Sequence, residues 1–176
     1  MITPATALRN VVLIGITITA AAATANHRQD LHPLFAHCTN EDVIWGAADT
    51  LRLPGDGRPW VIVIFKACCA SNRSAVRWAV EARNRYGDQV GFLGVNTDYA
   101  RSLSKVTPWL AAQKTNFPVI QDPSHITLKG FAVIAVPTLI ILNPEGEEIY
   151  ALAGFRGIND RDIDEKLSSF LHKPKP

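Results

Sequence analysis

Two adjacent cysteines stand between an apolar run and an amphipathic stretch, at a position where a sulfur atom could do chemistry. Cys68 and Cys69 follow the apolar residues 61–65 and precede a segment with helical periodicity. A thiol at a helix N-terminus faces unpaired N–H groups and the positive end of the helix dipole, which stabilise thiolate over thiol. This position favours a reactive cysteine over the alternative, a pair of small buried side chains without chemistry.

The elements around the cysteines follow from apolar patterning. Residues 61–65 are rich in β-branched side chains and too short to span a membrane, so we expect a central strand buried on both faces. The helix that follows has Val76 and Ala79 on its apolar face and ends at Gly87. Residues 90–96 form the next buried strand. Strand, helix and strand joined at this length predict a right-handed βαβ unit with parallel strands.

Two further helices are predicted from their cap residues. Thr107 and Pro108 resemble an N-cap followed by proline at the first helical position, and this helix is expected to end near Asn116. Ser124 is expected to cap a helix of one or two turns that ends at Phe131.

The last third of the chain predicts a hairpin and a helix. Residues 135–143 contain a proline followed by an apolar strand, residues 143–146 form a turn, and residues 148–152 pair back antiparallel. Asn159 or Asp160 opens a final helix. Its core-facing stripe consists of Ile163, Leu167, Phe170 and Leu171.

Composition excludes several classes of protein. The 176 residues fit one globular domain plus a short extra segment, and 47% hydrophobic residues suffice for a normal core. With 18 basic and 16 acidic residues the formal charge is +2, and no basic run suggests a nucleic-acid partner. Three cysteines are too few for a fold stapled by disulfides.

The N-terminus predicts a secretory signal. Arg9 is the single charged side chain before His27, and the apolar stretch 11–25 ends in small residues that fit cleavage before Asn26. An uncleaved anchor is the alternative, but the stretch is short for a spanning helix. We expect a periplasmic or secreted protein with no membrane span after cleavage, in a compartment where disulfides can persist.

The domain organisation follows from these segments. Residues 43–53 are expected to form a short hairpin or edge strand before the turn at 54–57, and Cys38 lies in the segment that precedes them. The expected parts are a signal peptide (1–25), a lead-in segment (26–42), one domain (43–172) and a tail (173–176).

The order of these elements, with Val136-Pro137-Thr138 opening a β-hairpin, resembles the thioredoxin fold. More narrowly, about residues 43–172 are similar to the exported TlpA/ResA-like branch of thiol–disulfide oxidoreductases. The resemblance implies an α/β domain, a central mixed sheet with helices on both faces, preceded by a short N-terminal hairpin and signal segment. Other matching stretches are Gly57-Arg58-Pro59-Trp60-Val61, Val95-Asn96, Phe117-Pro118-Val119 leading to Asp122, and Asn143-Pro144-Glu145-Gly146.

The resemblance also implies a substrate-binding loop. In the family the proline of this loop is cis and faces the cysteines, so Pro137 would be cis. Val136 would offer backbone hydrogen bonds to a bound peptide, with Thr138 completing the loop. The alternative is a proline that merely starts a strand.

The cysteine motif departs from the family, whose members have Trp-Cys-x-x-Cys with a second, resolving thiol. If Cys68 is the attacking residue, Ser71 occupies the resolving position; if Cys69 is, Asn72 does. We favour Cys69 as the nucleophile, because its distance from Phe65 matches family variants with Phe-Lys-x-x-Cys. Neither register contains a resolving thiol, so a mixed disulfide with substrate would live longer and would be released by a small thiol, by a partner or by a more distant cysteine of the chain.

Other residues have open roles. Cys38 could act as a remote resolving thiol or form a structural disulfide with Cys68 or Cys69, whereas a Cys68–Cys69 disulfide would strain the intervening peptide. Lys66 could lower a thiol pKa, although an exposed loop lysine is commoner. Asp98 could accept a proton but more commonly would be a solvated loop carboxylate.

We therefore expect thiol–disulfide exchange on other exported proteins through a single-thiol site, either CxxS or CxxN. The partners would be exported cysteine-containing proteins or a membrane redox partner. The alternative is a redox-inactive binding or assembly factor that uses the groove beside Pro137. We expect no cofactor and no metal, because Cys68, Cys69 and the distant His125 lack the Cys-x-x-x-Cys spacing of copper chaperones with this fold.

Overall fold

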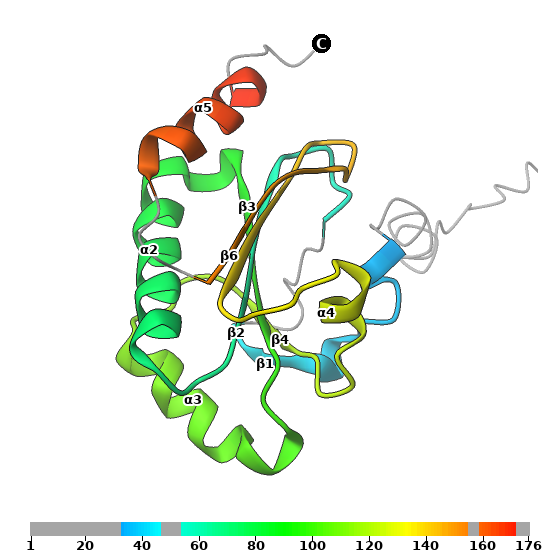
Figure 1. Cartoon of the computed structure of the whole chain (residues 1–176), viewed down its shortest axis with the longest axis vertical. Helices are drawn as coiled ribbons and strands as arrows, with labels where there is room; N and C mark the ends of the chain where they lie inside the picture. Colours follow the sequence, from blue (N-terminus) through cyan, green and yellow to red (C-terminus); the bar gives the residue numbers. More distant parts are fainter. Residues whose placement is uncertain (1–32, 47–53, 155–158, 172–176) are drawn as a thin grey trace, which may run out of the picture.

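The computed structural model describes residues 33–46, 54–154 and 159–171. The predicted signal peptide, residues 26–32 of the lead-in segment and the tail lie outside the described residues. The described chain forms one six-stranded mixed sheet between two layers of helices (Figure 1). The α/β class and the mixed sheet with helices on both faces are confirmed.

The strand order in the sheet is β1-β4-β3-β2-β5-β6. Strand β2 is central; β3 pairs parallel with both β2 and β4, whereas the pairs β1–β4, β2–β5 and β5–β6 are antiparallel. The predicted parallel pairing around the first helix is therefore confirmed. The strands are β1 (Val43–Trp45), β2 (Trp60–Phe65), β3 (Gly91–Asn96), β4 (Val119–Gln121), β5 (Thr138–Leu142) and β6 (Glu148–Ala153).

Helices α2, α3 and α5 cover one face of the sheet, and α4 with the short turn η1 covers the other (Figure 1). The α-helices are α2 (Ala70–Tyr86), α3 (Leu103–Ala112), α4 (Ile126–Gly130) and α5 (Asp160–Leu171). Short 3₁₀ turns are η1 (Pro33–Phe35), η2 (Asn40–Asp42), η4 (Gly87–Gln89) and η5 (Ala100–Ser102). Helix α2 ends at Gly87, as predicted.

Strand β2 supplies both halves of the core, which explains its uninterrupted apolar run. Val61 and Val63 face α2, whereas Ile62 and Ile64 face Phe35 of η1, and every residue of β2 is buried. Successive side chains of a strand point to opposite faces, so a strand covered on both sides must be apolar throughout. The predicted central strand is confirmed.

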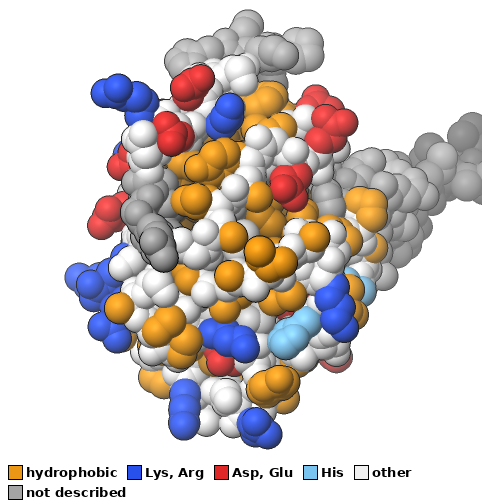
Figure 2. Space-filling view, in the orientation of Figure 1, with side chains coloured by type: hydrophobic (Ala, Val, Ile, Leu, Met, Phe, Trp, Pro, Cys, Tyr) orange, Lys and Arg blue, Asp and Glu red, His pale blue; other side chains and the backbone are white. Residues whose placement is uncertain are grey.

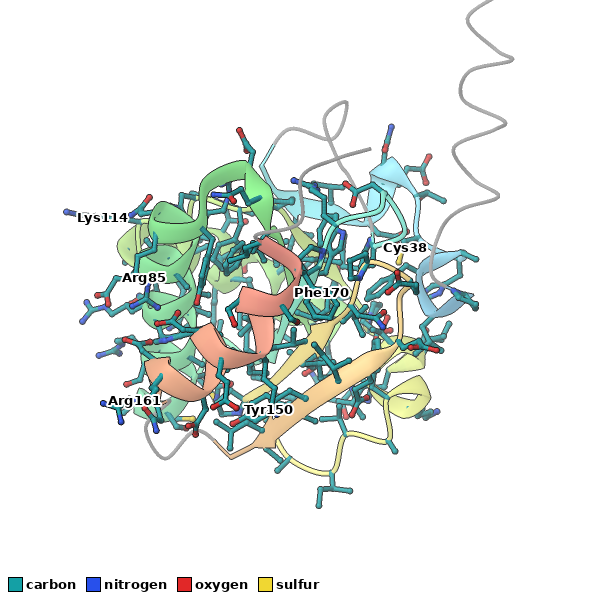
Figure 3. All side chains as sticks on the ribbon, turned by 90° about the horizontal axis from the view of Figure 1, so that it is seen from above. Cys38, Arg85, Lys114, Tyr150, Arg161 and Phe170 are labelled. Atoms are coloured by element: carbon teal, nitrogen blue, oxygen red, sulfur yellow. The ribbon has the colours of Figure 1, made fainter. Side chains whose placement is uncertain are left out.

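The surface charges are unevenly distributed. In the view of Figure 2, Asp and Glu side chains lie mostly in the upper half, whereas the lower edge carries mainly Lys, Arg and His. The carboxyl ends of β2 and β3 point to this lower edge (Figure 1). Seen from above in Figure 3, Arg85 of α2 and Cys38 lie on opposite sides of the sheet.

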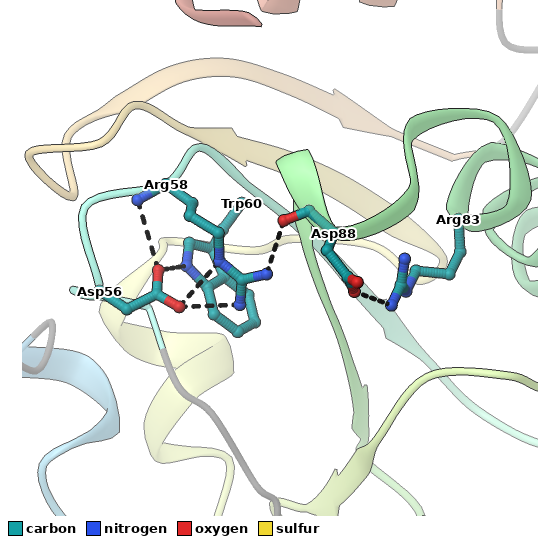
Figure 4. Close-up of polar contacts among 5 residues, drawn as sticks. All are labelled: Asp56, Arg58, Trp60, Arg83 and Asp88. Carbon is teal, nitrogen blue, oxygen red and sulfur yellow. Dashed lines mark hydrogen bonds and ion pairs between the residues drawn. The ribbon is translucent and has the colours of Figure 1, made fainter. Parts of the chain in front are cut away.

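A polar network anchors the opposite, amino-terminal end of β2 (Figure 4). The Asp56 carboxylate accepts the indole N–H of Trp60 at 2.9 Å and pairs with Arg58 at 2.7 Å. Arg58 also donates to the carbonyl of Asp88, whose carboxylate pairs with Arg83 at 2.7 Å. The network joins the turn before β2 to the segment before β3 and so sets where both strands begin.

The helix predicted to begin at Thr107 and Pro108 begins earlier, so this prediction is wrong. Both residues lie inside α3, whose N-cap is Ser102. Val106 and Leu110, one turn apart, are both buried, so packing favours a helix that includes them. Pro108 is exposed, and so is Ser104, the residue four positions earlier whose carbonyl loses its helical donor because proline has no N–H.

The same helix ends at Ala112 rather than near Asn116. Lys114 adopts a positive φ of 55°, and the Thr115 N–H returns to the carbonyl of Leu110 at 3.2 Å, which closes the helix.

The N-cap residue of α4 is His125, and the side chain that caps the helix belongs to Asp122 and not to Ser124, which corrects a second prediction. The two carboxylate oxygens of the buried Asp122 accept the N–H groups of Ile126 at 2.8 Å and Leu128 at 3.1 Å. The two oxygens of this carboxylate thus satisfy two of the free N–H groups at the start of the helix.

Strand β1 lies at the edge of the sheet and pairs with β4, with Val43 opposite Ile120. Residues 43–53 were predicted to form a short hairpin or an edge strand. The edge strand is confirmed for residues 43–45, and residues 47–53 lie outside the described part of the chain. The predicted hairpin at the other edge is also present, closed by the Gly146 N–H on the carbonyl of Asn143 at 2.9 Å.

Candidate functional site

Cys69 is the N-cap residue of α2, with extended dihedrals of φ −119° and ψ 172°. Its carbonyl accepts the N–H of Arg73 at 3.1 Å, so the helix is hydrogen-bonded from Cys69 onward. Cys68 and Cys69 are both free and exposed. The predicted position of these sulfurs at a helix N-terminus is confirmed, whereas their catalytic role stays a prediction.

Asn72 connects the thiol of Cys69 to the backbone of the preceding loop. Its Oδ1 accepts the N–H of Lys66 at 3.1 Å, and its Nδ2 lies 2.9 Å from Cys69 Sγ and 3.6 Å from Cys68 Sγ. Because a backbone N–H can only donate, the oxygen must face Lys66 and the NH₂ group must face the sulfurs. Asn72 is 1% exposed, so this orientation is held by packing as well.

The two sulfurs have opposite acid–base properties. Ser71 Oγ lies 3.4 Å from Cys69 Sγ, and hydrogen bonds from Ser71, from the Asn72 amide and from the Asn72 backbone lower the pKa of Cys69 to about 6. Burial and the hydrogen bond with Cys69 raise the pKa of Cys68. At neutral pH Cys69 is therefore the thiolate and Cys68 the thiol.

Asp98 is part of the site scaffold rather than a solvated carboxylate. Its Oδ2 accepts the N–H of Ala67 at 2.7 Å and the side-chain NH₂ of Asn96 at 2.8 Å. It therefore ties the loop that carries the cysteines to the end of β3.

Lys66 was predicted as a residue that could lower a thiol pKa. Its ammonium lies over the ring of Tyr99 at 5.8 Å, and the groups that lower the pKa of Cys69 are hydrogen-bond donors rather than this ammonium.

The proline loop lies at the same end of the sheet as the cysteines. Thr138 pairs with Ile64, so Pro137 lies beside Phe65, the last residue of β2 before the cysteine loop. The Val136–Pro137 peptide bond is cis, as the resemblance implies. Within the described part of the chain Val136 forms no backbone hydrogen bond.

Cys38 lies on the face of the sheet opposite α2, packed against the half of the core that contains Phe35 (Figure 3). Burial, together with the nearby charges of Asp42 and Asp122, raises the pKa of Cys38 to about 12. Its Sγ lies 3.7 Å from Nε2 of His37. All three cysteines are free in this structure, so neither disulfide considered for Cys38 is formed.

Two residues beside the site, Tyr99 and Arg101, were missed in the sequence. Arg101 places its guanidinium over the Tyr99 ring at 5.2 Å, just beyond the carboxyl end of β3. Their position after a predicted parallel strand could have identified them, because loops after the carboxyl ends of parallel strands often carry functional side chains.

A cavity lies away from the cysteines, and the described residues contain neither a metal cluster nor a membrane-spanning helix. A cavity of about 860 Å³ opens at the amino ends of β2 and β3, away from the cysteines, and is lined among others by Arg58, Tyr86 and Phe170. In residues 33–46, 54–154 and 159–171 no group of three His, Cys, Asp or Glu side chains could hold a metal ion. No helix within those ranges is both long and apolar enough to cross a membrane.

The chain has the thioredoxin fold, with cysteines at the first helix of the sheet and a cis-proline before an antiparallel hairpin. No protein-family model and no curated protein matches the sequence. Solved structures match instead. A candidate thiol:disulfide interchange protein DsbE from Chlorobium tepidum is 20% identical, with a TM-score of 0.60 over 66% of this chain and 82% of that one.

Two further solved structures are similar over comparable lengths. StoA from Bacillus subtilis is 21% identical, with a TM-score of 0.54 over 64% of this chain and 84% of its own. A secreted disulfide oxidoreductase from Mycobacterium tuberculosis, described as homologous to E. coli DsbE, is 13% identical. Its TM-score is 0.57 over 72% of this chain and 92% of its own.

Proposed function

We propose that this chain is an exported thioredoxin-like protein that performs thiol–disulfide exchange on other exported proteins through one thiol, Cys69. The observation that carries the proposal is the hydrogen bond of 2.9 Å from Asn72 Nδ2 to Cys69 Sγ at the N-terminus of α2. It stabilises an exposed thiolate, which is the nucleophile of disulfide exchange. The predicted signal sequence supports export, and two of the similar structures are described as a thiol:disulfide interchange protein and as a secreted disulfide oxidoreductase, which supports the redox form of the proposal.

The first step is attack on a disulfide of a partner protein. Cys69 thiolate attacks one sulfur of R–S–S–R′, forms Cys69–S–S–R and expels R′–S⁻, so one disulfide replaces another without an external oxidant. The helix N-terminus and the amide of Asn72 stabilise the thiolate before attack. An extended partner segment would lie along Val136, whose backbone groups have no partner in the described chain.

The second step requires a thiol from outside the site. The position of a resolving cysteine holds Asn72, and Cys38 has a pKa of about 12, so it is protonated at neutral pH. A small thiol or a second protein thiol, as its thiolate R″–S⁻, attacks the sulfur of R in Cys69–S–S–R, forms R–S–S–R″ and releases Cys69 thiolate. The proposed cycle is thus an exchange by one thiol and not a net reduction by two.

Trapping of the mixed disulfide tests this proposal. The native protein is incubated with the oxidised form of a short cysteine peptide, and the adduct is located by mass spectrometry. We expect one peptide bound at Cys69, no adduct in Cys69→Ser, and an adduct retained in Cys68→Ser. Cysteines that stay unmodified in the native protein at every pH would refute exchange and favour the binding or assembly factor that uses the groove beside Pro137.

N-terminal sequencing of the exported protein tests the remaining part of the proposal. A mature chain that begins at Asn26 is expected if residues 1–25 are a cleaved signal. A chain that retains residues 1–25 and stays with membranes would instead indicate an anchor.

A further inference from the structure

The exposed large apolar side chains of the described residues lie in connections at one end of the sheet. They are Tyr99, Ile126 and Ile134, with 53%, 47% and 93% of their surface exposed. Tyr99 follows β3, Ile126 follows β4, and Ile134 precedes β5, which runs antiparallel to its neighbour β2. All three connections therefore lie at the end of the sheet that carries the cysteines, where exposed apolar surface marks an interaction site.

Tyr99 is surrounded by positive charge. The ammonium of Lys66 and the guanidinium of Arg101 lie over its ring, at 5.8 Å and 5.2 Å, and the ring of His125 is 6.0 Å away. The ion pairs formed among described residues belong to Arg58, Arg83 and Arg85, at other places in the fold. Lys66 and Arg101 have no carboxylate partner within those residues.

The cluster is held in a fixed relation to the reactive sulfur. The backbone N–H of Lys66 is bonded to Asn72, whose amide is bonded to Cys69 Sγ. On the other side, Asp98 precedes Tyr99 and accepts the N–H of Ala67 at 2.7 Å. Asp98 is the acidic group next to the cluster, and one of its oxygens is already occupied by two N–H donors.

We propose that Lys66, Tyr99 and Arg101 form a docking surface for an acidic and apolar segment next to the reacting cysteine of the partner protein. This inference rests on the proposed function and specifies its substrate class. Unpaired cations over an aromatic ring attract carboxylates, and Ile126 and Ile134 extend the apolar contact beyond what a small anionic thiol would cover. The occupant is therefore a polypeptide segment in which Asp or Glu and apolar residues flank the cysteine.

Exchange with a matched set of peptides tests the docking surface. Three peptides carry one cysteine as a mixed disulfide with 2-thiopyridine, flanked by leucine and by Glu, Gln or Lys. In the Cys38→Ser/Cys68→Ser background, Cys69 thiolate attacks the peptide sulfur, forms the peptide adduct and expels pyridine-2-thione, which is followed by its absorbance. We expect the Glu peptide to react about three- to tenfold faster than the Lys peptide at low salt, a ratio that falls as salt is added.

Charge-neutralising variants locate the effect. Lys66→Gln and Arg101→Gln should each reduce the Glu-over-Lys ratio, whereas the matched control Arg161→Gln on α5 should leave it unchanged. Equal rates for the Glu and Lys peptides, or equal effects of all three variants, would overturn the docking surface although exchange itself proceeds.

Peptides with serine in place of cysteine separate docking from exchange. The Glu form should bind more tightly than the Lys form and shift the ring resonances of Tyr99. Binding that does not depend on the peptide charge would overturn the docking surface even if Cys69 proved unreactive. A Cys69 that ignores all three disulfide peptides while the serine peptides bind as expected would refute the proposed exchange alone.

Discussion

Asn72 Nδ2 lies 2.9 Å from Cys69 Sγ, one helical turn along α2 and at the place where the family that this chain resembles has its second cysteine. An amide at this position cannot form a disulfide, but it can donate a hydrogen bond to a thiolate. This geometry supports the proposed exchange through one thiol, in which the amide stabilises the thiolate of Cys69.

Removal of the Asn72 amide should raise the pKa of Cys69. Asn72→Ala deletes the 2.9 Å hydrogen bond to the thiolate, and because Cys69 is exposed and water replaces part of this bond, we expect a rise of about one pKa unit. The pH dependence of iodoacetamide labelling at Cys69 measures the shift. Ser71→Ala, which removes the 3.4 Å contact of the hydroxyl with the same sulfur, should also raise the pKa of Cys69. An unchanged midpoint in Asn72→Ala would refute the role of the amide.

The alkylation rate of Cys69 should increase with pH around its pKa of about 6 and then level off. A lowered thiol pKa means that thiolate is present above this value and is lost as the pH falls through it. Cys68, whose pKa is raised, should react at markedly higher pH. Mass spectrometry of peptides after short labelling at each pH distinguishes the two sites. A Cys69 that titrates near 8.5, like an ordinary thiol, would remove the basis for a thiolate nucleophile.

A second thiol at position 72 should convert the site into a dithiol pair. Asn72→Cys places a thiol one turn after Cys69, so the mixed disulfide can be resolved within the site. The reduction of insulin in the presence of dithiothreitol should then exceed that of the native protein, and Asn72→Ser serves as a matched control without sulfur. Activity that appears only in Asn72→Cys, with no exchange by the native protein in the adduct experiment, would count against an enzyme.

Most of the fold could be predicted because its signals are local. The β2 run is buried on both faces, and the turn at residues 143–146 closes the β5–β6 hairpin, so patterning and turn chemistry determine both. The start of α3 could not be predicted from its cap residues. Burial of Val106 and Leu110 extends the helix to the amino side of Pro108, and this packing depends on tertiary structure.

The site could be predicted in its position but not in its contacts. Cys69 at a helix N-terminus and Asn72 three residues later follow from the sequence, whereas the bond that orients the Asn72 amide comes from the backbone of Lys66. The opposite pKa shifts of two adjacent cysteines likewise depend on which sulfur faces the donors. The cluster around Tyr99 brings together side chains from two loops, and spacing along the chain does not reveal it.

The packing of Trp60 on Gly91 should be sensitive to a single methyl group. A Cβ atom at Gly91 would overlap the Trp60 ring, and the ring cannot turn away because Asp56 accepts its N–H at 2.9 Å and Arg58 lies over it at 5.1 Å. Gly91→Ala should therefore lower the free energy of unfolding by about 1–3 kcal/mol, measured by urea denaturation.

Trp60→Leu is also destabilising because it removes a buried ring, but it makes room at Gly91. The double variant should lose less stability than the sum of the two single variants. Strictly additive losses would show that the overlap is relieved elsewhere, for example by a shift of β3. Labelling of Cys69 at neutral pH should be unchanged in the folded Gly91→Ala protein, because Cys69 lies at the other end of β2.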